Sequence, residues 1–274
     1  AVDLPTPEQE VEVEGGRPRL HFRAPLPVEG WNAQISLLTG TAAAALMLEA
    51  GVGLLRTLPP APEEAVASLR RSALALGVAW PEGASYGEVV SGLDPARPEA
   101  AAALTLATRL LRGAGYTAFD GGLPEQAVHA ALGAPYAHVT APLRRLVDRY
   151  AGEVCLALCA GGQPPDWVQA ALAALPTEMA EAQRRAATLE RECLNLVEAV
   201  VLESAIGQEF DAVVVDVDDH GGGVVQLCEP AVRGRCEGAP PLGEHVRVRL
   251  VEADPRARTV RFALAAAPAA PAAP

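Results

Sequence analysis

The residues with the clearest capacity for chemistry lie in the segment YAHVTAPLRRLVDRY, residues 136–150. This pattern predicts a helix that begins at Thr140 and has Pro142 in its first turn. The free backbone N–H groups and the positive dipole end of such a helix would point outward, and Arg144 would lie close to them. Amides, a hydroxyl and a guanidinium in one place favour a phosphate-sized anion. The alternative is an ordinary capped helix whose arginines lie in solvent or pair with Asp148.

The composition indicates a globular protein with an acidic balance. The chain has 274 residues, of which 50% are hydrophobic, so it can form one domain of good size and a small one. All 22 basic residues are arginines, and the formal net charge is -12. This balance argues against a protein that coats nucleic acid over its whole surface, while it leaves room for a narrow basic channel.

The cysteine pattern and the apolar runs bear on the cellular compartment. None of the five cysteines forms a CxxC pair or has a zinc-site spacing with histidine, which predicts thiols in a reducing cytoplasm. We expect no signal peptide and no membrane helix, because no apolar run approaches the roughly 18 residues that a span needs. The chain opens at Ala1 inside a patterned segment, so we expect it to be a piece of a longer protein.

Hydrophobic periodicity and turn residues predict the elements that surround the first segment. Alternation around Gly15-Gly16 predicts a β-hairpin over residues 10–22. Residues 114–139 are mixed, with short strand-like pieces between glycines and prolines. Helices are expected at 35–55, 63–76, 98–113, 140–160, 166–175 and 177–204, with a loop-rich stretch between the second and the third.

After Gly207 the pattern changes to short strand-like runs that are separated by Gly, Pro and Asp turns. The clearest of them are FDAVVVDV, GVVQL, HVRVRLVE and TVRFAL. Five short strands in about 60 residues suit a small OB-type barrel. The ending AAAPAAPAAP is of low complexity and is expected to be disordered. Together these features predict an α+β protein.

The segment 136–150 is similar to the late hallmark motif of the ribonuclease II (RNB) family, an aromatic residue followed by H-F-T-S-P-I-R-R-Y-x-D. The positions in register with that motif are Thr140, Pro142, Arg144, Arg145 and Asp148. Four mild replacements stand where the motif has Phe, Ser, Ile and Tyr, and they are Val139, Ala141, Leu143 and Leu146.

Further strings resemble the same family in the same order. RGAGYTAF (112–119) is similar to its A-x-Y segment, HAALGAPY (129–136) to its H-F-G-L-x-x-x-Y approach, and LERECLNL (189–196) to its A-E-R-D helix. NAQISLLTGTAAAALM (32–47) resembles a helix in which the family has a glutamate and an asparagine, both of which are altered here. The order and spacing of these matches are more specific than any one of them.

The resemblance implies an organisation and an activity. Residues 1–204 would form the later half of an RNB catalytic domain, with helices packed on a mixed sheet. A small five-stranded OB-fold RNA-binding domain would follow over 207–265, and 266–274 would be a disordered Ala/Pro tail. The protein would be a monomeric, cytoplasmic enzyme that hydrolyses single-stranded RNA processively from 3′ to 5′ and releases nucleoside 5′-monophosphates.

The family also implies roles for particular residues. Arg144 would neutralise the scissile phosphate, and Glu190 would help to hold the 3′-terminal nucleotide. The other substrate-binding or supporting positions would be Thr140, Tyr116, Tyr136, His138, Arg145 and His129. For Glu190 the alternative is a solvated carboxylate on a helix that also carries Glu192 and Glu198.

RNB enzymes hold divalent ions, usually Mg²⁺, on an aspartate cluster of the pattern D-x-D-D-A early in the domain. The similar string in this sequence, DVDD at 216–219, ends a strand just before HGGG and is interpreted as a hairpin turn. We therefore expect the Mg²⁺ ligands on the N-terminal half of the same protein, before residue 1. This chain alone is not expected to be a competent nuclease.

The predicted barrel has few aromatic residues for base stacking. Phe210 and Phe262 are expected in its core, which leaves His220 and His245 as substitutes. Its arginines are expected to form a basic face for contacts with the RNA backbone: Arg233, Arg235, Arg247, Arg249, Arg256, Arg258 and Arg261. RNA binding there would be weak and tolerant of sequence.

Two alternatives to the exoribonuclease stay open. A catalytically inactive homologue would only bind RNA or partners, and the retained Arg144 and Glu190 favour the enzyme because a pure binder has less need of a transition-state arginine. A helical protein-interaction domain fused to an OB barrel would show no RNA affinity at any salt concentration.

Overall fold

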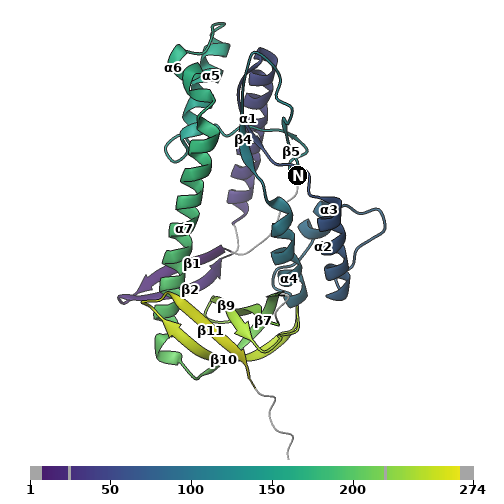
Figure 1. Cartoon of the computed structure of the whole chain (residues 1–274), viewed down its shortest axis with the longest axis vertical. Helices are drawn as coiled ribbons and strands as arrows, with labels where there is room; N and C mark the ends of the chain where they lie inside the picture. Colours follow the sequence, from purple (N-terminus) through teal and green to yellow (C-terminus); the bar gives the residue numbers. More distant parts are fainter. Residues whose placement is uncertain (1–7, 24–25, 219–220, 266–274) are drawn as a thin grey trace, which may run out of the picture. The chain divides into compact units, whose positions relative to one another are not determined.

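The computed structural model of the chain describes residues 8–23, 26–218 and 221–265. These residues form two compact units, each assembled from separate stretches of the sequence. The first unit takes in residues 26–66 and 108–188. The second takes in residues 8–23, 67–107 and the described residues from 189 onward. Figure 1 labels most of their helices and strands.

The first unit combines helices with short strands. Its strands are β3 (Val52–Thr57), β4 (Gly115–Asp120), β5 (Val128–His129) and β6 (Ala134–Pro135). Its helices are α1 (Pro27–Ala50), η1 (Thr108–Leu111), α5 (Leu146–Cys159), α6 (Asp166–Leu172) and the first part of α7 (Leu175–Leu202). The pairs β3–β4 and β5–β6 are antiparallel, and a parallel bridge joins Leu58 to His129.

The core of this unit lies where α1 and α5 pack on β3. Met47 of α1, Leu54 and Leu55 of β3, and Val147 and Val154 of α5 are all buried in one cluster. Because β3 is buried along nearly its whole length, its sequence lacks the alternation of a half-exposed strand. The core holds β3 and its partner β4 rigidly, and β4 carries one of the predicted site residues.

The predicted helix over residues 35–55 is wrong at both ends. α1 already begins at Pro27, and it ends at Ala50 because Gly51 takes up a left-handed conformation with φ 72°. The residues that follow form β3 rather than a continued helix. A short buried strand and a buried helix segment cannot be told apart by periodicity, which explains the error.

The start of α5 also differs from its prediction. The helix expected to begin at Thr140 begins later, and Thr140 lies in a bend before it. The amides of Arg144 and Arg145 bond back to the carbonyl oxygen of Ala141 at 3.2 and 3.0 Å. The amide of Ala141 donates to the Asp148 carboxylate at 2.7 Å. These amides are satisfied inside the protein, so the predicted anion site at a helix terminus at Thr140 does not form.

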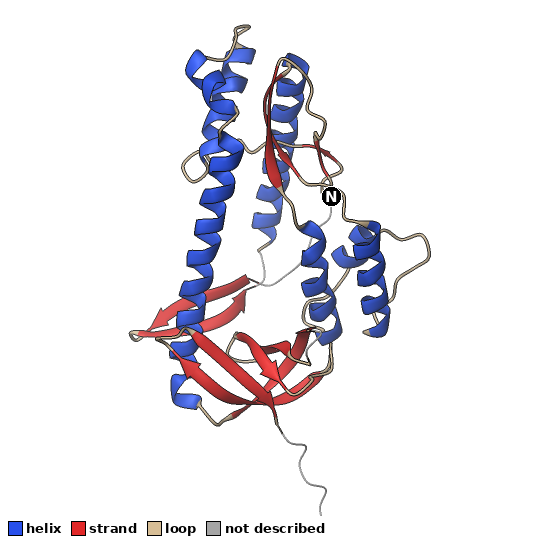
Figure 2. Cartoon of the chain, viewed as in Figure 1, coloured by secondary structure: helices blue, strands red, loops and turns tan. Residues whose placement is uncertain are grey.

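The second unit contains a five-stranded barrel. Its strands are β7 (Glu209–Val217), β8 (Gly223–Leu227), β9 (Arg233–Glu237), β10 (His245–Asp254) and β11 (Thr259–Leu264), drawn in red in Figure 2. They close in the order β10-β11-β9-β8-β7, with β9 and β11 parallel. Val214, Leu250 and Phe262 are fully buried inside. The expected five-stranded OB-type barrel and the α+β fold class are confirmed.

The other elements of this unit are a hairpin and helices. The hairpin consists of β1 (Glu8–Glu14) and β2 (Arg17–Arg23) and confirms the prediction around Gly15-Gly16. The helices include α2 (Glu63–Ala75), which starts in the first unit, α3 (Tyr86–Ser91), α4 (Pro98–Ala107) and η2 (Glu203–Ala205). α3 lies in the stretch expected to be loop-rich, and it forms because Ser85 and Glu88 make a capping box.

The hairpin packs on the barrel, although almost the whole chain separates them. Leu20 is buried in the barrel core, and its carbonyl oxygen accepts the amide of Ala231 at 3.2 Å. Nε2 of Gln9 donates to the carboxylate of Glu198 at 2.8 Å. The hairpin therefore belongs with the barrel in space, whereas the predicted boundaries place it with residues 1–204. The predicted tail at 266–274 lies outside the described residues.

Among the described residues, α1 has the length and the apolar composition of a candidate membrane span. The expectation that no apolar run approaches this length is therefore wrong. Isolated Asn, Gln, Thr and Gly residues interrupt the apolar run, but the mean hydropathy of the helix remains high enough for a candidate span. Core helices of soluble proteins and signal sequences pass the same test, so this property is weak evidence for a membrane.

Candidate functional site

Two neighbouring arginines in the turn before α5 have different surroundings. Nε and Nη2 of Arg145 each donate to the Asp148 carboxylate at 2.8 Å. The Asp148 side chain is fully buried, and it also accepts the amide of Ala141. The Arg144 side chain is exposed and has no ion pair or hydrogen bond to another described residue. Arg145 therefore pairs with Asp148, whereas Arg144 is exposed to solvent.

A cluster of tyrosine and histidine side chains lies where β4 meets the segment after β6. The hydroxyl of Tyr116 is 2.8 Å from Nδ1 of His138, and both side chains are partly buried. Burial, together with the nearby charge of Arg145, lowers the pKa of His138 from 6.5 to about 4. Burial raises the pKa of Tyr116. Both groups are therefore uncharged at neutral pH.

Two more rings complete this Tyr–His cluster, which consists of Tyr116, His129, Tyr136 and His138. The ring of Tyr136 makes edge contacts with His138 and His129, with centroids 5.5 and 6.3 Å apart. Burial lowers the pKa of His129 and raises that of Tyr136. Nδ1 of His129 is buried and finds no hydrogen-bond partner among the described residues. Four predicted site residues are thus brought together.

Arg56 is a charged neighbour of the cluster that the sequence analysis did not single out. It lies opposite Tyr116 in the β3–β4 pair, and its guanidinium carbon is 4.8 Å from the centre of the Tyr116 ring. Its charge lowers the pKa of both His129 and His138. Because a helix was expected through residue 55, the pairing of β3 with β4 was not predicted. That pairing is what places Arg56 beside Tyr116.

The remaining predicted residues, Thr140 and Glu190, are both exposed. Glu190 lies on α7, in the part that belongs to the second unit, and makes no ion pair with another described residue. The neighbouring Glu192 pairs with Arg258 at 2.6 Å instead. Because Glu190 and Arg144 belong to different units, their roles stay separate predictions.

The described residues do not fit a metal site. No group of three or more His, Cys, Asp or Glu side chains gathers in the described part of the chain. In the DVDD string, the amide of Gly222 donates to the carboxylate of Asp218 at 2.9 Å, and the Asp218 amide bonds to the Gly222 carbonyl oxygen at 2.8 Å. These contacts are those of a turn between β7 and β8, as the sequence predicts. Asp219 lies outside the described residues.

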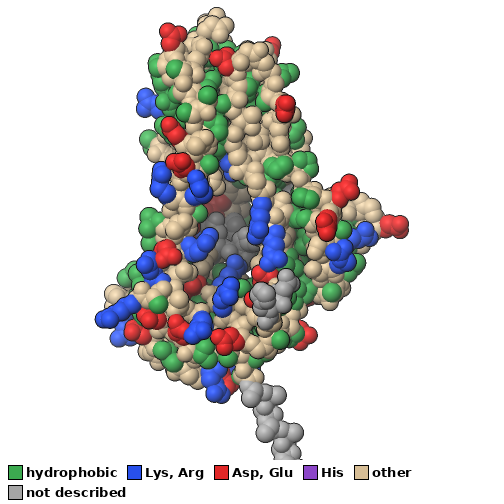
Figure 3. Space-filling model, viewed as in Figure 1, with side chains coloured by type: hydrophobic (Ala, Val, Ile, Leu, Met, Phe, Trp, Pro, Cys, Tyr) green, Lys and Arg blue, Asp and Glu red, His purple; other side chains and the backbone are tan. Residues whose placement is uncertain are grey.

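The arginines expected to form a basic face on the barrel are mostly paired with carboxylates. The pairs are Arg247–Asp211 at 3.1 Å, Arg249–Glu209 at 3.0 Å, Arg258–Glu192 at 2.6 Å and Arg261–Glu237 at 3.3 Å. Arg233 donates to Gln226 at 2.8 Å. The guanidinium groups of Arg235 and Arg256 have no partner among the described residues. Basic and acidic side chains lie next to one another over the barrel (Figure 3), so the expected basic face is largely neutralised.

The aromatic residues of the barrel are in its interior. Phe262 is fully buried, Phe210 packs partly buried against the same core, and their rings meet edge to face at 6.5 Å. The prediction that both belong to the core is confirmed. His245 is exposed, whereas His220 lies outside the described residues. The described barrel therefore presents no exposed Phe, Tyr or Trp on which a base could stack.

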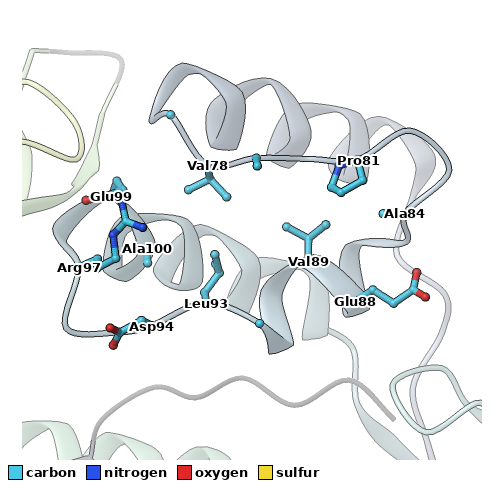
Figure 4. Close-up of a pocket in the computed structure, with 13 residues that line it drawn as sticks. Val78, Pro81, Ala84, Glu88, Val89, Leu93, Asp94, Arg97, Glu99 and Ala100 are labelled. Atoms are coloured by element: carbon cyan, nitrogen blue, oxygen red, sulfur yellow. Dashed lines mark ion pairs between the residues drawn. The ribbon is translucent and has the colours of Figure 1, made fainter.

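The second unit also contains a pocket of about 430 Å³ between the segment after α2, α3 and the start of α4 (Figure 4). Val78, Val89 and Leu93 give it apolar walls, and an Arg97–Glu99 ion pair lies at one end. None of the predicted site residues lines it. Its walls come from short segments with no motif, so the sequence carried no signal for it.

Residues 208–265 match the family model of the RNase II-type exonuclease C-terminal S1 domain. The barrel is therefore similar to the S1 domain of RNase II-type exonucleases. The matched residues span β7 to β11, so the sequence match and the closed barrel describe the same part of the chain. Among curated proteins, none matches this sequence.

Solved structures share the fold of nearly the whole chain. The apo form of Mycoplasma genitalium RNase R has a TM-score of 0.81 over 96% of this chain, at 16% sequence identity. An active-site mutant of the Dss1 exoribonuclease from Candida glabrata has a TM-score of 0.69 over 97%, also at 16%. Yeast Ssd1, a pseudonuclease, has a TM-score of 0.56 over 80%, at 20%.

The chain spans less than half the length of these proteins: 46% of RNase R, 32% of Dss1 and 28% of Ssd1. At such identities the likeness is one of fold. The S1 domain and this fold together confirm the resemblance to the RNB family that the motifs carry.

Proposed function

We propose that this chain is the C-terminal part of an exoribonuclease that hydrolyses single-stranded RNA processively from the 3′ end and releases nucleoside 5′-monophosphates. The observation that carries the proposal is an RNase II-type S1 domain that follows a body with the fold of RNase R. Mycoplasma genitalium RNase R has been solved in complex with ribose-methylated single-stranded RNA, which supports this class of substrate. We further infer a monomeric protein that works in the cytoplasm.

Arg144 is the residue that we assign to the scissile phosphate. Its guanidinium is exposed, so it can bind a phosphate without breaking an ion pair. The neighbouring Arg145 is held by Asp148, which keeps the turn in place while Arg144 stays available. A fixed cation next to developing negative charge lowers the barrier to phosphodiester hydrolysis. Glu190, an exposed carboxylate, would hold the 3′-terminal nucleotide.

Hydrolysis of this kind uses divalent metal ions to activate water and to stabilise the leaving oxygen. Because the described residues do not fit a metal site, we assign the Mg²⁺ ligands to the N-terminal half of the same protein. This chain would then supply the phosphate-binding arginine and the S1 domain, and the other half would supply the metal chemistry.

A second candidate function is RNA binding without catalysis. The fold likeness to yeast Ssd1, a pseudonuclease, favours it, since this fold also occurs in a protein without nuclease activity. Both candidates keep RNA affinity, so only a test of hydrolysis separates them.

The test uses the complete protein with its N-terminal half, 5′-labelled oligo(A) and Mg²⁺. The enzyme should produce a ladder that shortens from the 3′ end, and Arg144→Ala should slow it about 100-fold through lost electrostatic stabilisation. Arg149→Ala is the matched control, because Arg149 is also exposed, unpaired within the described residues, and lies close by on α5. Its ladder should match that of the wild type.

The outcomes are separable. An intact substrate together with salt-sensitive RNA binding would establish the inactive homologue. A ladder that is unchanged in Arg144→Ala would leave the exonuclease standing and would remove the assigned role of Arg144. No RNA affinity at any salt concentration would overturn both candidates and support a protein-interaction domain.

A further inference from the structure

We propose that Tyr116 is a positioning residue that fixes His138 in the tautomer with its proton on Nε2, and that this N–H donates a hydrogen bond to a phosphate oxygen of the bound RNA. The first part concerns the protein alone. The second part rests on the proposed function, because it requires that the chain binds RNA.

The geometry of the pair selects the tautomer. The Tyr116 hydroxyl is 2.8 Å from Nδ1 of His138, a distance at which one atom donates and the other accepts. His138 Nδ1 is the hydrogen-bond partner that the described residues offer to this partly buried hydroxyl. If Nδ1 carried the proton, the hydroxyl proton of Tyr116 would have no acceptor among the described residues. The hydroxyl therefore donates, Nδ1 accepts, and the imidazole proton lies on Nε2.

The backbone holds both members of the pair in place. Tyr116 lies on β4, which is paired with β3 along its length, and the guanidinium of Arg56 lies over the Tyr116 ring. His138 follows β6, and the preceding Ala137 donates its amide to the carbonyl oxygen of Gly40 at 3.1 Å. The edge contact with Tyr136 limits rotation of the His138 ring. The imidazole is thus oriented before any ligand arrives.

The charges around His138 favour a neutral donor and an anionic acceptor. Arg56 comes from β3 and Arg145 from the turn before α5, and both oppose protonation of the imidazole. Asp148 acts in the opposite direction, but its carboxylate is occupied by Arg145. The remaining titratable neighbours, Tyr116, His129 and Tyr136, are uncharged at neutral pH. Burial is the main cause of the lowered pKa of His138, and the positive field of Arg145 and Arg56 that adds to it also attracts a phosphate.

This arrangement separates His138 from a general acid or base. With a pKa of about 4, the imidazole does not change its protonation state between roughly pH 5 and pH 8. Its contribution to RNA binding should be constant over that range. A histidine with an ordinary pKa would gain a positive charge near pH 6 and would strengthen binding there.

The first experiment reads the tautomer directly in the ¹⁵N-labelled 274-residue chain. Two-bond ¹H–¹⁵N correlation spectra at neutral pH should show the pattern of an imidazole protonated on Nε2 for His138. Tyr116→Phe should convert this pattern into a mixture of both tautomers. Tyr136→Phe is the matched control, because its ring touches His138 while its hydroxyl does not bond to Nδ1. A wild-type spectrum with the pattern of an imidazole protonated on Nδ1 would by itself overturn the assignment.

The second experiment measures the affinity of the same chain for labelled oligo(A). His138→Ala should weaken binding about tenfold, the effect of one hydrogen bond to a charged acceptor. His138→Gln should recover most of the loss, because its amide places an N–H where Nε2 lies in histidine. Between roughly pH 5 and pH 8, titration of His138 should cause no change in the affinity of the wild type. The affinities of the wild type and of His138→Gln should therefore depend on pH in the same way over this range.

These outcomes distinguish the inference from the proposed function. If the chain binds oligo(A) and His138→Ala binds equally well, the phosphate contact is wrong while RNA binding stands. If neither the wild type nor any variant binds oligo(A), the RNA binding that the proposed function assigns to this chain fails, and the spectra still decide the tautomer.

Discussion

Arg145 donates two hydrogen bonds of 2.8 Å to the buried carboxylate of Asp148, and this pair fixes the turn from which the preceding residue, Arg144, extends into solvent. The amide of Ala141 binds the same carboxylate, so Asp148 closes the turn at both ends. Two adjacent arginines of one motif thus have separate tasks. Arg145 maintains the structure, and Arg144 is free to bind a ligand.

Asp148→Asn should destabilise the chain by about 3 kcal/mol, because it leaves the Arg145 charge without its buried partner. Urea denaturation at neutral pH measures this difference in the free energy of unfolding. Glu181→Gln is the control, since Glu181 and Arg185 form an exposed pair at 3.9 Å that should contribute less than about 0.5 kcal/mol. Equal stability of the two variants would show that the buried pair does not hold the turn.

Acid should destabilise the first unit before most carboxylates are protonated. The pKa of His138 is about 4 in the folded chain and 6.5 in the unfolded chain, so the unfolded state binds its proton first as the pH falls. The stability is complete above 6.5, decreases as the pH falls from 6.5 to about 4, and does not change further on this account below that. His129, whose pKa is also lowered, acts in the same direction.

The check compares urea midpoints at about pH 7 and about pH 5 for the wild type and His138→Gln. The variant should lose less stability between the two conditions, because it has no imidazole at this position. A parallel decline in both proteins would assign the acid sensitivity to other groups.

Two glycines of α1 should respond in opposite directions to alanine. A Cβ at Gly40 would overlap the Tyr136 ring and the Ala137 carbonyl oxygen, so Gly40→Ala should cost about 2 kcal/mol or more. A Cβ at Gly30 meets open space, so Gly30→Ala should stabilise the helix by about 0.5 to 1 kcal/mol. Thermal unfolding of the two variants measures both signs. A stable Gly40→Ala variant would mean that α1 does not approach Tyr136 this closely.

The S1 domain should use few arginines for phosphate contacts. Replacing Arg235 and Arg256 together with alanine should reduce the slope of log K against log salt by about 1.4, or about 0.7 for each lost contact with single-stranded RNA. Replacing Arg247 and Arg249 should change the slope less, because Asp211 and Glu209 already neutralise them. Titration of labelled oligo(A) at several salt concentrations checks this. The reverse order of effects would mean that RNA displaces the carboxylates.

The sequence predicts elements whose signal is local. β10 alternates exposed and buried residues over much of its length, and the hairpin turns at two glycines with positive φ, so both were recognisable. β3 was not, because a strand that is buried almost throughout has no alternation to detect. The start of α5 was missed for another reason. It depends on a carboxylate seven positions away from the amide that it binds.

The candidate site follows the same rule. The motif located Arg144 and His138 along the chain, but the contact of Tyr116 with His138 spans 22 residues and needs the fold. Arg56 entered only with the pairing of β3 and β4. The basic face of the barrel was overestimated because the carboxylates that neutralise it come from other strands. Charge counted along a sequence does not show which charges meet.

The closed barrel leaves no open strand edge, but the β1–β2 hairpin does, because in the described structure these two strands pair only with each other. Val11 and Val13 are exposed on β1, and a stretch of this kind can pair with the same stretch of another copy. Two of the glutamates that alternate with them, Glu14 and Glu10, form ion pairs with Arg19 at 2.7 Å and Arg23 at 2.9 Å on β2. This edge therefore has neither burial nor a continuous row of uncompensated charge to prevent strand pairing between copies.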